Sequence, residues 1–226
     1  MKVEAPVLLT PRCPVCDLAL GCSGPCPNYW CRREDRGFEV VWAIGEHRGE
    51  LRRAIAALKY RGERRWIPVL GKMLASYLIE HAPCFDDIDL IVGTPGNVGR
   101  ARPEDHTAAV LYAARPSVGD LWPVDAPGPS GLPVLAKRVE TRAMAGMPSA
   151  GVRRLWAAGE LRSVLVVTDP ARVRGRRVLA VDDVFTDGST LREVAIALRS
   201  AGASAVSGLA LARQPLTTQR PRFGRR

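Results

Sequence analysis

Residues 178–190, VLAVDDVFTDGST, decide the fold class that we predict for this chain. The segment opens with four apolar residues in a row, which is typical of a parallel strand buried on both faces. Asp182 and Asp183 follow at the carboxyl end of this strand, and a turn containing glycine leads into an amphipathic pattern over 191–202. A strand, a polar loop and a helix in this order predict one unit of an α/β fold with a parallel sheet.

The polar part of this segment has the chemistry of a site for a phosphorylated sugar. Adjacent carboxylates such as Asp182 and Asp183 repel each other, so a fold keeps both where a ligand or hydrogen bonds neutralise them, as a sugar diol does with or without Mg²⁺. Hydroxyls and backbone amides at the start of a helix favour an anion. The residues that offer them are Thr186, Asp187, Gly188, Ser189 and Thr190. The segment therefore predicts a ribose 5-phosphate site; the alternative is an ordinary strand–turn–helix in which Asp187 or Ser189 caps the helix.

The rest of the chain alternates between strand and helix patterns. Strands are predicted over 38–46, 88–96 (running into a loop), 119–124, 163–169, 178–183 and 205–213. Helices are predicted over 48–60, 65–81, 104–114 and 191–202. Residues 125–133 have the composition of a loop, and 134–162 are ambiguous. The alternation over 88–213 implies a parallel sheet with helices on both faces, and ligands in such folds bind beyond the carboxyl ends of the strands.

Five of the six cysteines lie within residues 13–31, a segment rich in Pro and Gly that cannot bury a core of its own. This clustering favours a metal over a disulfide framework. The favoured ligands are Cys13, Cys16, Cys26 and Cys31. Cys22 is the alternative in the second pair, because neither spacing there has the ideal two residues. Four thiolates predict a structural Zn²⁺, although free or redox-active cysteines are the other interpretation.

The length of 226 residues suits one medium domain with a small appendage. We expect a cysteine-rich module over 1–37, a main domain over 38–213 and a basic, disordered tail over 214–226. No apolar run approaches the roughly 20 residues that cross a membrane, and we expect no membrane span and a cytoplasmic location. The net charge of +10 favours an anionic partner, although dispersed arginines also fit a solvated surface.

The block at 178–190 resembles the phosphoribosyl pyrophosphate (PRPP) signature of type I phosphoribosyltransferases. The whole chain is similar to the ComF-like branch, whose members join an N-terminal cysteine-rich zinc module to that domain. The matching stretches are CPVC at 13–16, HRGELRRAIAALKYRGE at 47–63 and GRRVLAVDDVFTDGSTL at 175–191. The likeness is weak from about 97 to 150, where the family tends to show an Arg-Gly-Phe-Asn-like stretch that this chain lacks.

The resemblance implies the fold and the roles of particular residues. Asp182 and Asp183 would hold the ribose hydroxyls, and the turn from Thr186 to Thr190 would hold the 5-phosphate. The loop of Thr94, Pro95, Gly96 and Asn97 would lie where the family binds pyrophosphate, and Mg²⁺ would accompany PRPP. Family members cover the site with a mobile loop. Our candidate cations for such a loop, chosen by location and charge, are Lys137, Arg138 and Arg142.

One position departs from the family pattern. The family commonly has Thr where this chain has Asp187, and a carboxylate there would repel a phosphate unless it points outward to cap the helix. We therefore predict that Asp187 weakens PRPP binding. The position four residues beyond Asp182 is Thr186, so the sequence offers no strong general base.

The implied activity is transfer of a phosphoribosyl group to a nitrogen nucleophile, a nucleobase or ammonia, with release of pyrophosphate. One alternative is a regulator that binds PRPP or a nucleotide without turnover. The other is an accessory to DNA uptake, because the resemblance carries an association with natural competence.

Aromatic and basic residues near the cysteines bear on the last alternative. Tyr29 and Trp30, beside Arg32 and Arg33, offer the stacking and charge that single-stranded DNA binders use. Such aromatics more often pack against a neighbouring domain. Lys59 ends the predicted helix over 48–60, where it either faces the site or stabilises the helix dipole. The scattered histidines have no evident partner, and we assign no catalytic role to His47, His81 or His106.

Overall fold

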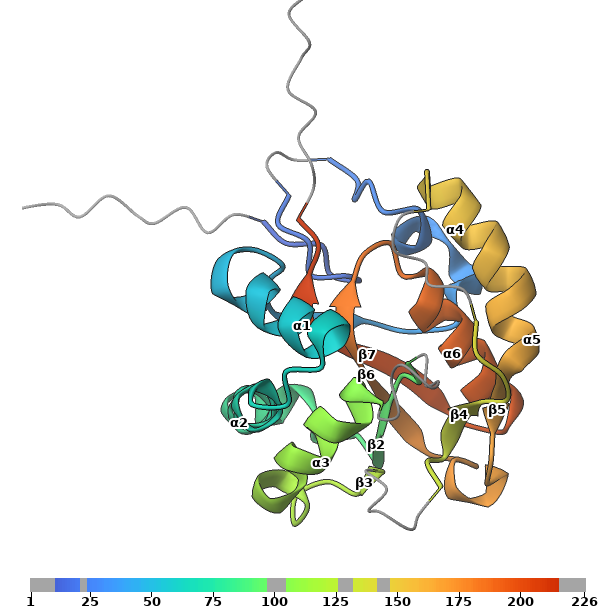
Figure 1. Ribbon diagram of the computed structural model, residues 1–226. Helices are drawn as coiled ribbons and strands as arrows, with labels where there is room; N and C mark the ends of the chain where they lie inside the picture. Colours follow the sequence, from blue (N-terminus) through green and yellow to red (C-terminus); the bar gives the residue numbers. More distant parts are fainter. Residues whose placement is uncertain (1–10, 21–23, 97–104, 126–131, 142–146, 216–226) are drawn as a thin grey trace, which may run out of the picture.

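The computed structural model describes residues 11–20, 24–96, 105–125, 132–141 and 147–215. Within these residues the chain forms helices and short helical turns around two sheets (Figure 1). In chain order the elements are η1 (Tyr29–Arg32), η2 (Glu34–Arg36), β1 (Val41–Glu46), α1 (Gly49–Arg61), α2 (Trp66–Glu80), η3 (Ala82–Cys84), β2 (Leu90–Gly93), α3 (His106–Val118), β3 (Val124–Asp125), β4 (Leu135–Lys137), α4 (Ala150–Trp156), η4 (Ala157–Leu161), α5 (Arg162–Val164), β5 (Leu165–Val167), η5 (Pro170–Arg172), β6 (Arg177–Phe185), α6 (Ser189–Ser200) and β7 (Ala205–Arg213).

The larger sheet is parallel, with strand order β1-β7-β6-β2-β3 among the described residues. β6 lies at its centre and pairs with β7 on one side and β2 on the other. Every residue of β7 is buried, as expected for a central parallel strand. The prediction of an α/β fold is therefore confirmed, and the carboxyl ends of these parallel strands lie at one edge of the sheet.

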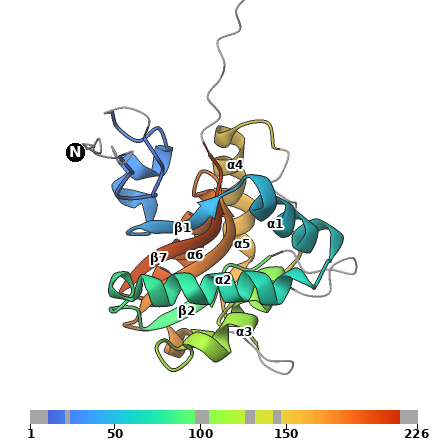
Figure 2. The same cartoon turned by 90° about the vertical axis from the view of Figure 1, so that its left-hand side faces the viewer.

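The two faces of the sheet are covered by different elements because side chains alternate along each strand. Leu179 and Val181 of β6 pack in one cluster with apolar residues of α1, α2 and α3. Val178 and Ala180, one position away, pack in a second cluster with α6 and the cysteine segment. The result is three layers with the sheet in the middle, as Figures 1 and 2 show from two directions.

The cysteine segment packs against the second face. The backbone N–H of Val41 donates to the carbonyl of Val15 at 2.8 Å, which joins this segment to the start of β1. Cys13, Cys16 and Trp30 share a hydrophobic cluster with α6. Figure 2 shows the segment beside β1 at the end of the sheet. Its burial therefore depends on the larger sheet as well as on its own residues.

Two strand predictions are wrong in part. The strand predicted over 163–169 does not enter the main sheet: β5 pairs antiparallel with β4 in a separate sheet. All three residues of β5 are only half-buried, which fits a small outer sheet. The strand predicted over 119–124 is reduced to β3, because α3 continues to Val118 and Pro123 has no N–H to donate to a ladder.

Residues 134–162, left ambiguous by the sequence, contain β4, α4 and η4. The predicted disordered tail lies outside the described residues from position 216 onward. In the part of the chain that the structure describes, no helix has the length and apolar character needed to cross a membrane.

Candidate functional site

The two aspartates of β6 lie at the carboxyl edge of the sheet, next to the end of β2. The hydroxyl of Thr94 donates to Oδ1 of Asp182 at 2.7 Å. The backbone N–H of Asp183 donates to the same oxygen at 2.9 Å. The strand pairing explains this contact, because the N–H of Thr94 donates to the carbonyl of Val181 and so brings the β2 loop alongside the acidic pair.

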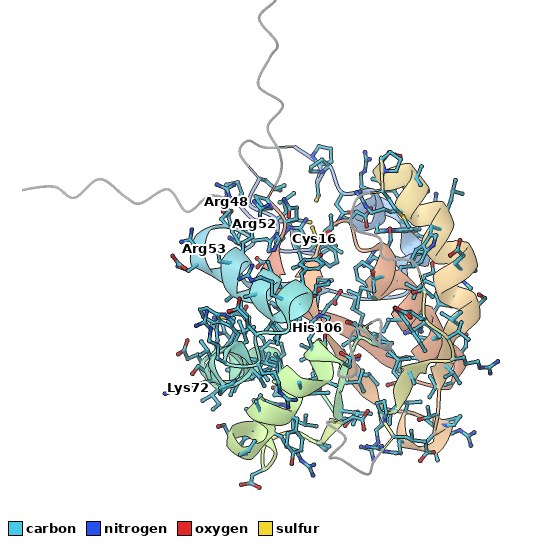
Figure 3. All side chains as sticks on the ribbon, in the orientation of Figure 1. Cys16, Arg48, Arg52, Arg53, Lys72 and His106 are labelled. Carbon is cyan, nitrogen blue, oxygen red and sulfur yellow. The ribbon has the colours of Figure 1, made fainter. Side chains whose placement is uncertain are left out.

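Asp183 is buried and accepts from two side chains that arrive from other elements. Nζ of Lys59, near the end of α1, lies 2.5 Å from Oδ2 of Asp183. Nε2 of His106, the first residue of α3, lies 2.8 Å from the same oxygen. Figure 3 shows His106 at the end of α3 that faces α1. Burial opposes ionisation of this carboxyl, but Lys59 and His106 outweigh it and hold the pKa of Asp183 well below its ordinary value.

The other carboxyl of the pair behaves in the opposite way. Burial and the neighbouring charge of Asp183 raise the pKa of Asp182 to about 6, although Lys59 and Thr94 act against the rise. The environment therefore separates the two carboxyls, with one firmly ionised and the other close to accepting a proton. Separation of this kind is common at functional sites.

The turn between β6 and α6, residues 186–190, is called here the β6–α6 turn. Gly188 precedes α6 with φ of 86°, a left-handed conformation that favours glycine. Ser189 opens the helix and is buried, and its Oγ has no hydrogen-bond partner among the described residues. Thr186 is exposed and Thr190 is half-buried. The turn thus carries a helix N-terminus, an unpartnered hydroxyl and accessible threonine side chains.

Asp187 has two partners in this turn. Its Oδ1 accepts from the backbone N–H of Ser189, two residues on, at 3.1 Å, which makes an Asx-type turn ahead of the helix, whose N-cap is Gly188. Its Oδ2 pairs with Nε of Arg153 from α4 at 3.0 Å. The negative charge at this position is therefore balanced by a cation that the sequence did not associate with it.

The loop after β2 is held in place by Asp105. Oδ2 of Asp105 accepts from the backbone N–H of Gly96 at 2.6 Å, while Oδ1 accepts from Thr107 and Ala108 at the start of α3. Thr94 is buried, and Pro95 and Gly96 are partly accessible. Asn97 lies outside the described residues, as do Arg142 and Cys22.

A cavity of about 980 Å³ adjoins this loop. Its walls come from the ends of β2, β3 and β4 and from α2 and α3. Thr94, Pro95, Gly96, Lys137 and Arg138 are among its lining residues. Cavities at the carboxyl ends of parallel strands are where α/β folds commonly bind ligands.

The structure corrects the prediction that Lys137 and Arg138 belong to a loop over the site. Lys137 is the last residue of β4 and so belongs to a strand rather than to a loop over the site. Burial lowers the pKa of Lys137, partly offset by Asp105 and Asp182. Arg138 follows and is exposed, with its backbone N–H bonded to Val164. The antiparallel pairing of β4 with β5 fixes both positions.

Four cysteines converge in the N-terminal segment, with their sulfurs within 4.8 Å of one another. They are Cys13, Cys16, Cys26 and Cys31. Tetrahedral Zn²⁺ with Zn–S bonds of about 2.3 Å places its sulfurs about 3.8 Å apart, and Sγ of Cys16 lies 3.7 Å from Sγ of Cys26. Without a metal the thiols affect one another: a hydrogen bond with Cys31 lowers the pKa of Cys16 to about 5, the same bond raises the pKa of Cys31, and burial raises that of Cys26 to about 11, so the support for zinc comes from the geometry. The cluster fits a zinc site.

Residues 134–225 match the phosphoribosyl transferase domain family. This match covers the acidic pair, the β6–α6 turn, Lys137 and Arg153, whereas the β2 loop, Lys59, His106 and the cysteines lie before it. The comparison with curated proteins gives no match.

Among solved structures, the chain is similar to the allosteric regulatory enzyme of purine biosynthesis, with 26% identity and a TM-score of 0.39 over 64% of this chain and 25% of that one. Glutamine PRPP amidotransferase from B. subtilis, complexed with ADP and GMP, gives 25% identity and a TM-score of 0.39 over 64% and 26%. PRPP synthetase from Mycobacterium smegmatis gives 18% identity and a TM-score of 0.31 over 62% and 33%. The chain thus spans a quarter to a third of the length of these proteins.

Three residues around the site were missed or misjudged from the sequence. His106 was assigned no role, yet it contacts Asp183, and this correction follows from the start of α3 facing the end of β6. Arg153 was not associated with Asp187. Lys59 was left open and faces the site. The one usable signal was that Lys59 and His106 stand at the ends of predicted helices, where side chains can reach a sheet edge.

The aromatic pair beside the cysteines divides into one buried and one exposed ring. Trp30 is 7% exposed and packs in the core, so it is not free to stack on a base. Tyr29 is 39% exposed, but the guanidinium of Arg154 lies 4.3 Å from its ring centroid. The expectation that such aromatics pack against the neighbouring fold is confirmed for Trp30.

Proposed function

We propose that this protein binds PRPP with Mg²⁺ and transfers the phosphoribosyl group to a nitrogen nucleophile, with release of pyrophosphate. One observation carries the proposal: the acidic pair at the end of β6 leads directly into a helix N-terminus, inside a segment that matches the phosphoribosyl transferase domain. The acidic pair suits the hydroxyls of a ribose 5-phosphate, and the start of the helix suits its phosphate.

Asp182 and Asp183 are the proposed partners of the ribose hydroxyls. A hydroxyl donates to a carboxylate oxygen as Lys59 and His106 do now, so a diol can join or replace these donors on Asp183. The pKa of Asp182, raised to about 6, leaves this carboxyl ionised near pH 7.5 and able to accept from a ligand.

The β6–α6 turn is the proposed site of the 5-phosphate. The backbone amides at the start of α6 and the helix dipole favour an anion, and the hydroxyls of Thr186, Ser189 and Thr190 can donate to it. The ion pair of Asp187 with Arg153 supports this assignment, since it offsets the one negative charge within the turn.

Pyrophosphate is proposed to occupy the cavity beside the β2 loop. Thr94, Pro95 and Gly96 line it, with Thr94 bonded to Asp182, and Lys137 and Arg138 line it as well. Carboxylate and hydroxyl oxygens on this edge suit Mg²⁺, which prefers hard oxygen ligands. When bound, Mg²⁺ supplies charge neutralisation for the pyrophosphate.

In the proposed reaction the bond between C1 of the ribose and the pyrophosphate oxygen breaks, and a nitrogen lone pair forms the new bond to C1. Positive charge develops at C1 as pyrophosphate leaves. The chain contributes positioning of the two reactants and the cations that stabilise the leaving group. The nitrogen loses its proton to solvent or to a side chain near the cavity.

Calorimetry with Mg-PRPP tests the binding, and pyrophosphate release in the presence of ammonia or a panel of nucleobases tests the transfer. We expect saturable binding by the wild-type chain and none by Asp182→Asn/Asp183→Asn. The proposal fails if Mg-PRPP gives no heat with the wild type, or if the double variant binds it equally well.

Binding without turnover is the second candidate. It is favoured by the turn after Asp182, where the position four residues on is Thr186, which is no strong general base, and where Asp187 stands in place of a threonine. Mg-PRPP binding without pyrophosphate release across the whole acceptor panel would select this candidate.

The finer assignment to the ComF-like branch is also a proposal, supported by the four-cysteine cluster ahead of the matched domain. It includes a structural Zn²⁺, a division at about residues 37 and 213, a cytoplasmic location and a role in DNA uptake. A steep salt dependence of binding to single-stranded DNA would support that role.

A further inference from the structure

We propose that Trp30 is a positioning residue for the β6–α6 turn and that it couples metal binding by the cysteines to binding of the phosphorylated ligand. The inference rests on the proposed function. It joins two sites that are adjacent in space but lie at opposite ends of the chain.

Trp30 stands between two of the metal-binding cysteines. It lies in η1, which begins after Cys26 and includes Cys31. The side chain of Asn28 caps this turn by accepting from the N–H of Trp30 at 3.2 Å. A metal that holds both Cys26 and Cys31 therefore fixes the backbone on each side of the indole ring.

The indole ring packs against the β6–α6 turn. A Cβ atom at Gly188 would lie 3.3 Å from Cδ1 of Trp30 and 3.0 Å from Cζ of Phe185. Both rings thus contact the backbone of the turn itself. Gly188 has no side chain and adopts a left-handed φ of 86°, so the two rings support its conformation together with hydrogen bonds on either side of it, from Ser189 N–H to Asp187 and from Arg192 N–H to the carbonyl of Gly188.

Cations from the helices on either side complete this contact. The guanidinium of Arg192, in the first turn of α6, lies 4.5 Å from the ring centroid of Trp30. It also pairs with the buried carboxylate of Glu193 at 2.7 Å. On α4, Arg154 covers the ring of Tyr29, and its neighbour Arg153 pairs with Asp187. The aromatic residues of η1 therefore hold both helices that meet at the turn.

These contacts have a thermodynamic consequence. Backbone amides bind a phosphate well only when the turn already has the bound geometry. Loss of the metal frees η1, and the turn then loses one of the two rings packed on Gly188. Linkage requires the effect to be reciprocal, so ligand binding at the turn must raise the affinity of the cysteines for metal by the same factor.

The test measures both affinities on the full chain. Zinc affinity is measured by competition with a zinc chelator that leaves Mg²⁺ free, with and without saturating Mg-PRPP. We expect Mg-PRPP to tighten zinc binding about tenfold and zinc removal to weaken Mg-PRPP binding by the same factor. Trp30→Leu should keep one zinc per chain, weaken Mg-PRPP about tenfold and abolish the linkage, and Trp30→Phe should restore part of it.

Trp66→Leu is the matched control, because Trp66 is a partly buried tryptophan in the other hydrophobic cluster. It should leave the linkage unchanged. Equal zinc affinities with and without Mg-PRPP overturn the inference while the proposed function stands. A wild-type chain that binds no Mg-PRPP, or no zinc, overturns the inference too, and the first of these also overturns the proposed function. If Trp30→Leu fails to fold, the wild-type linkage still tests the coupling between the two sites, and Trp30→Phe tests the indole ring: a linkage in Trp30→Phe equal to that of the wild type would overturn the role of Trp30.

Discussion

The Nε2 atom of His106 lies 2.8 Å from Oδ2 of Asp183, across 77 positions of sequence. The same oxygen accepts from Lys59, so one carboxylate joins the ends of two helices to the central strand of the sheet. Asp183 is therefore both a candidate ligand-binding group and a structural connection among α1, α3 and β6.

Removal of Lys59 should leave a buried carboxylate with one donor fewer. We expect Lys59→Met to lower the free energy of unfolding by about 1 to 3 kcal/mol at pH 7. Because the pKa of Asp183 is lowered and that of Lys59 is raised, this stabilisation should be present between about pH 4 and pH 10 and decline outside that window. Urea denaturation across pH measures it.

Lys72→Met is the control for this change, because Lys72 is exposed on α2 and its loss should cost within about 0.5 kcal/mol. His106→Ala, combined with Lys59→Met, should destabilise by more than the sum of the single variants, since either donor partly compensates for the other. Strict additivity would show that the two donors do not compensate for each other at Asp183.

Asp182→Asn should weaken ligand binding and raise the stability of the fold. An amide keeps an oxygen that accepts from Thr94 but removes a half-buried charge beside Asp183. Since the pKa of Asp182 is raised to about 6, the folded state holds this proton more tightly than the unfolded state, and ionisation lowers stability as pH rises. We expect the variant to be about 1 to 3 kcal/mol more stable at pH 8, with a difference that shrinks toward pH 5.

Thermal unfolding at pH 5 and pH 8 checks this prediction, and calorimetry should show weaker Mg-PRPP binding by the same variant. A stability difference that is equal at the two pH values would contradict the assigned pKa shift.

Gly188→Ala should disrupt the β6–α6 turn by two effects at once. The new Cβ would meet Phe185 and Trp30, and the residue would keep a positive φ that alanine disfavours. We expect a loss of about 2 to 4 kcal/mol in the free energy of unfolding and loss of Mg-PRPP binding. Gly175→Ala, with φ of 73° and open space around it, isolates the backbone effect and should cost about 1 kcal/mol.

The ion pair of Arg153 with Asp187 should control phosphate affinity. Arg153→Met leaves Asp187 uncompensated in the turn, so we expect Mg-PRPP affinity to fall about five- to tenfold. In an Asp187→Thr background the same substitution should have little effect. Calorimetry on the wild type, the two single variants and the double variant completes this double-mutant cycle. Equal effects of Arg153→Met on Mg-PRPP affinity in both backgrounds would refute the idea that Arg153 compensates for the charge of Asp187.

The cysteine cluster should bind one zinc per chain. Cys13→Ser should release the metal and destabilise the N-terminal segment, because the metal would join its four cysteines while the packing against α6 and β1 remains. Cys84→Ser is the control, since Cys84 is exposed and outside the cluster. Metal analysis of both variants, with Cys22→Ser alongside, tests Cys13 and Cys22 as ligands; retention of zinc by Cys13→Ser would exclude Cys13 from the site.

Local patterns predicted the part of the fold that depends on neighbouring residues. The apolar run before Asp182, the glycine at 188 and the amphipathic helix appear as β6, the turn and α6, although the helix begins at Ser189 rather than at 191. Period-based arguments failed where the pattern was short, as at β3 and β5, because a few apolar residues do not specify which sheet they join.

The sequence by itself determined the groups that come from residues close together along the chain: the paired carboxylates, the hydroxyl-rich turn and the clustered thiols. The tertiary structure alone decided which cations serve them, because Lys59, His106 and Arg153 arrive from separate helices. It also placed Trp30 on Gly188. The physical reason is that parallel strands bring distant loops to one edge, and no local preference of a residue encodes which partner it meets there.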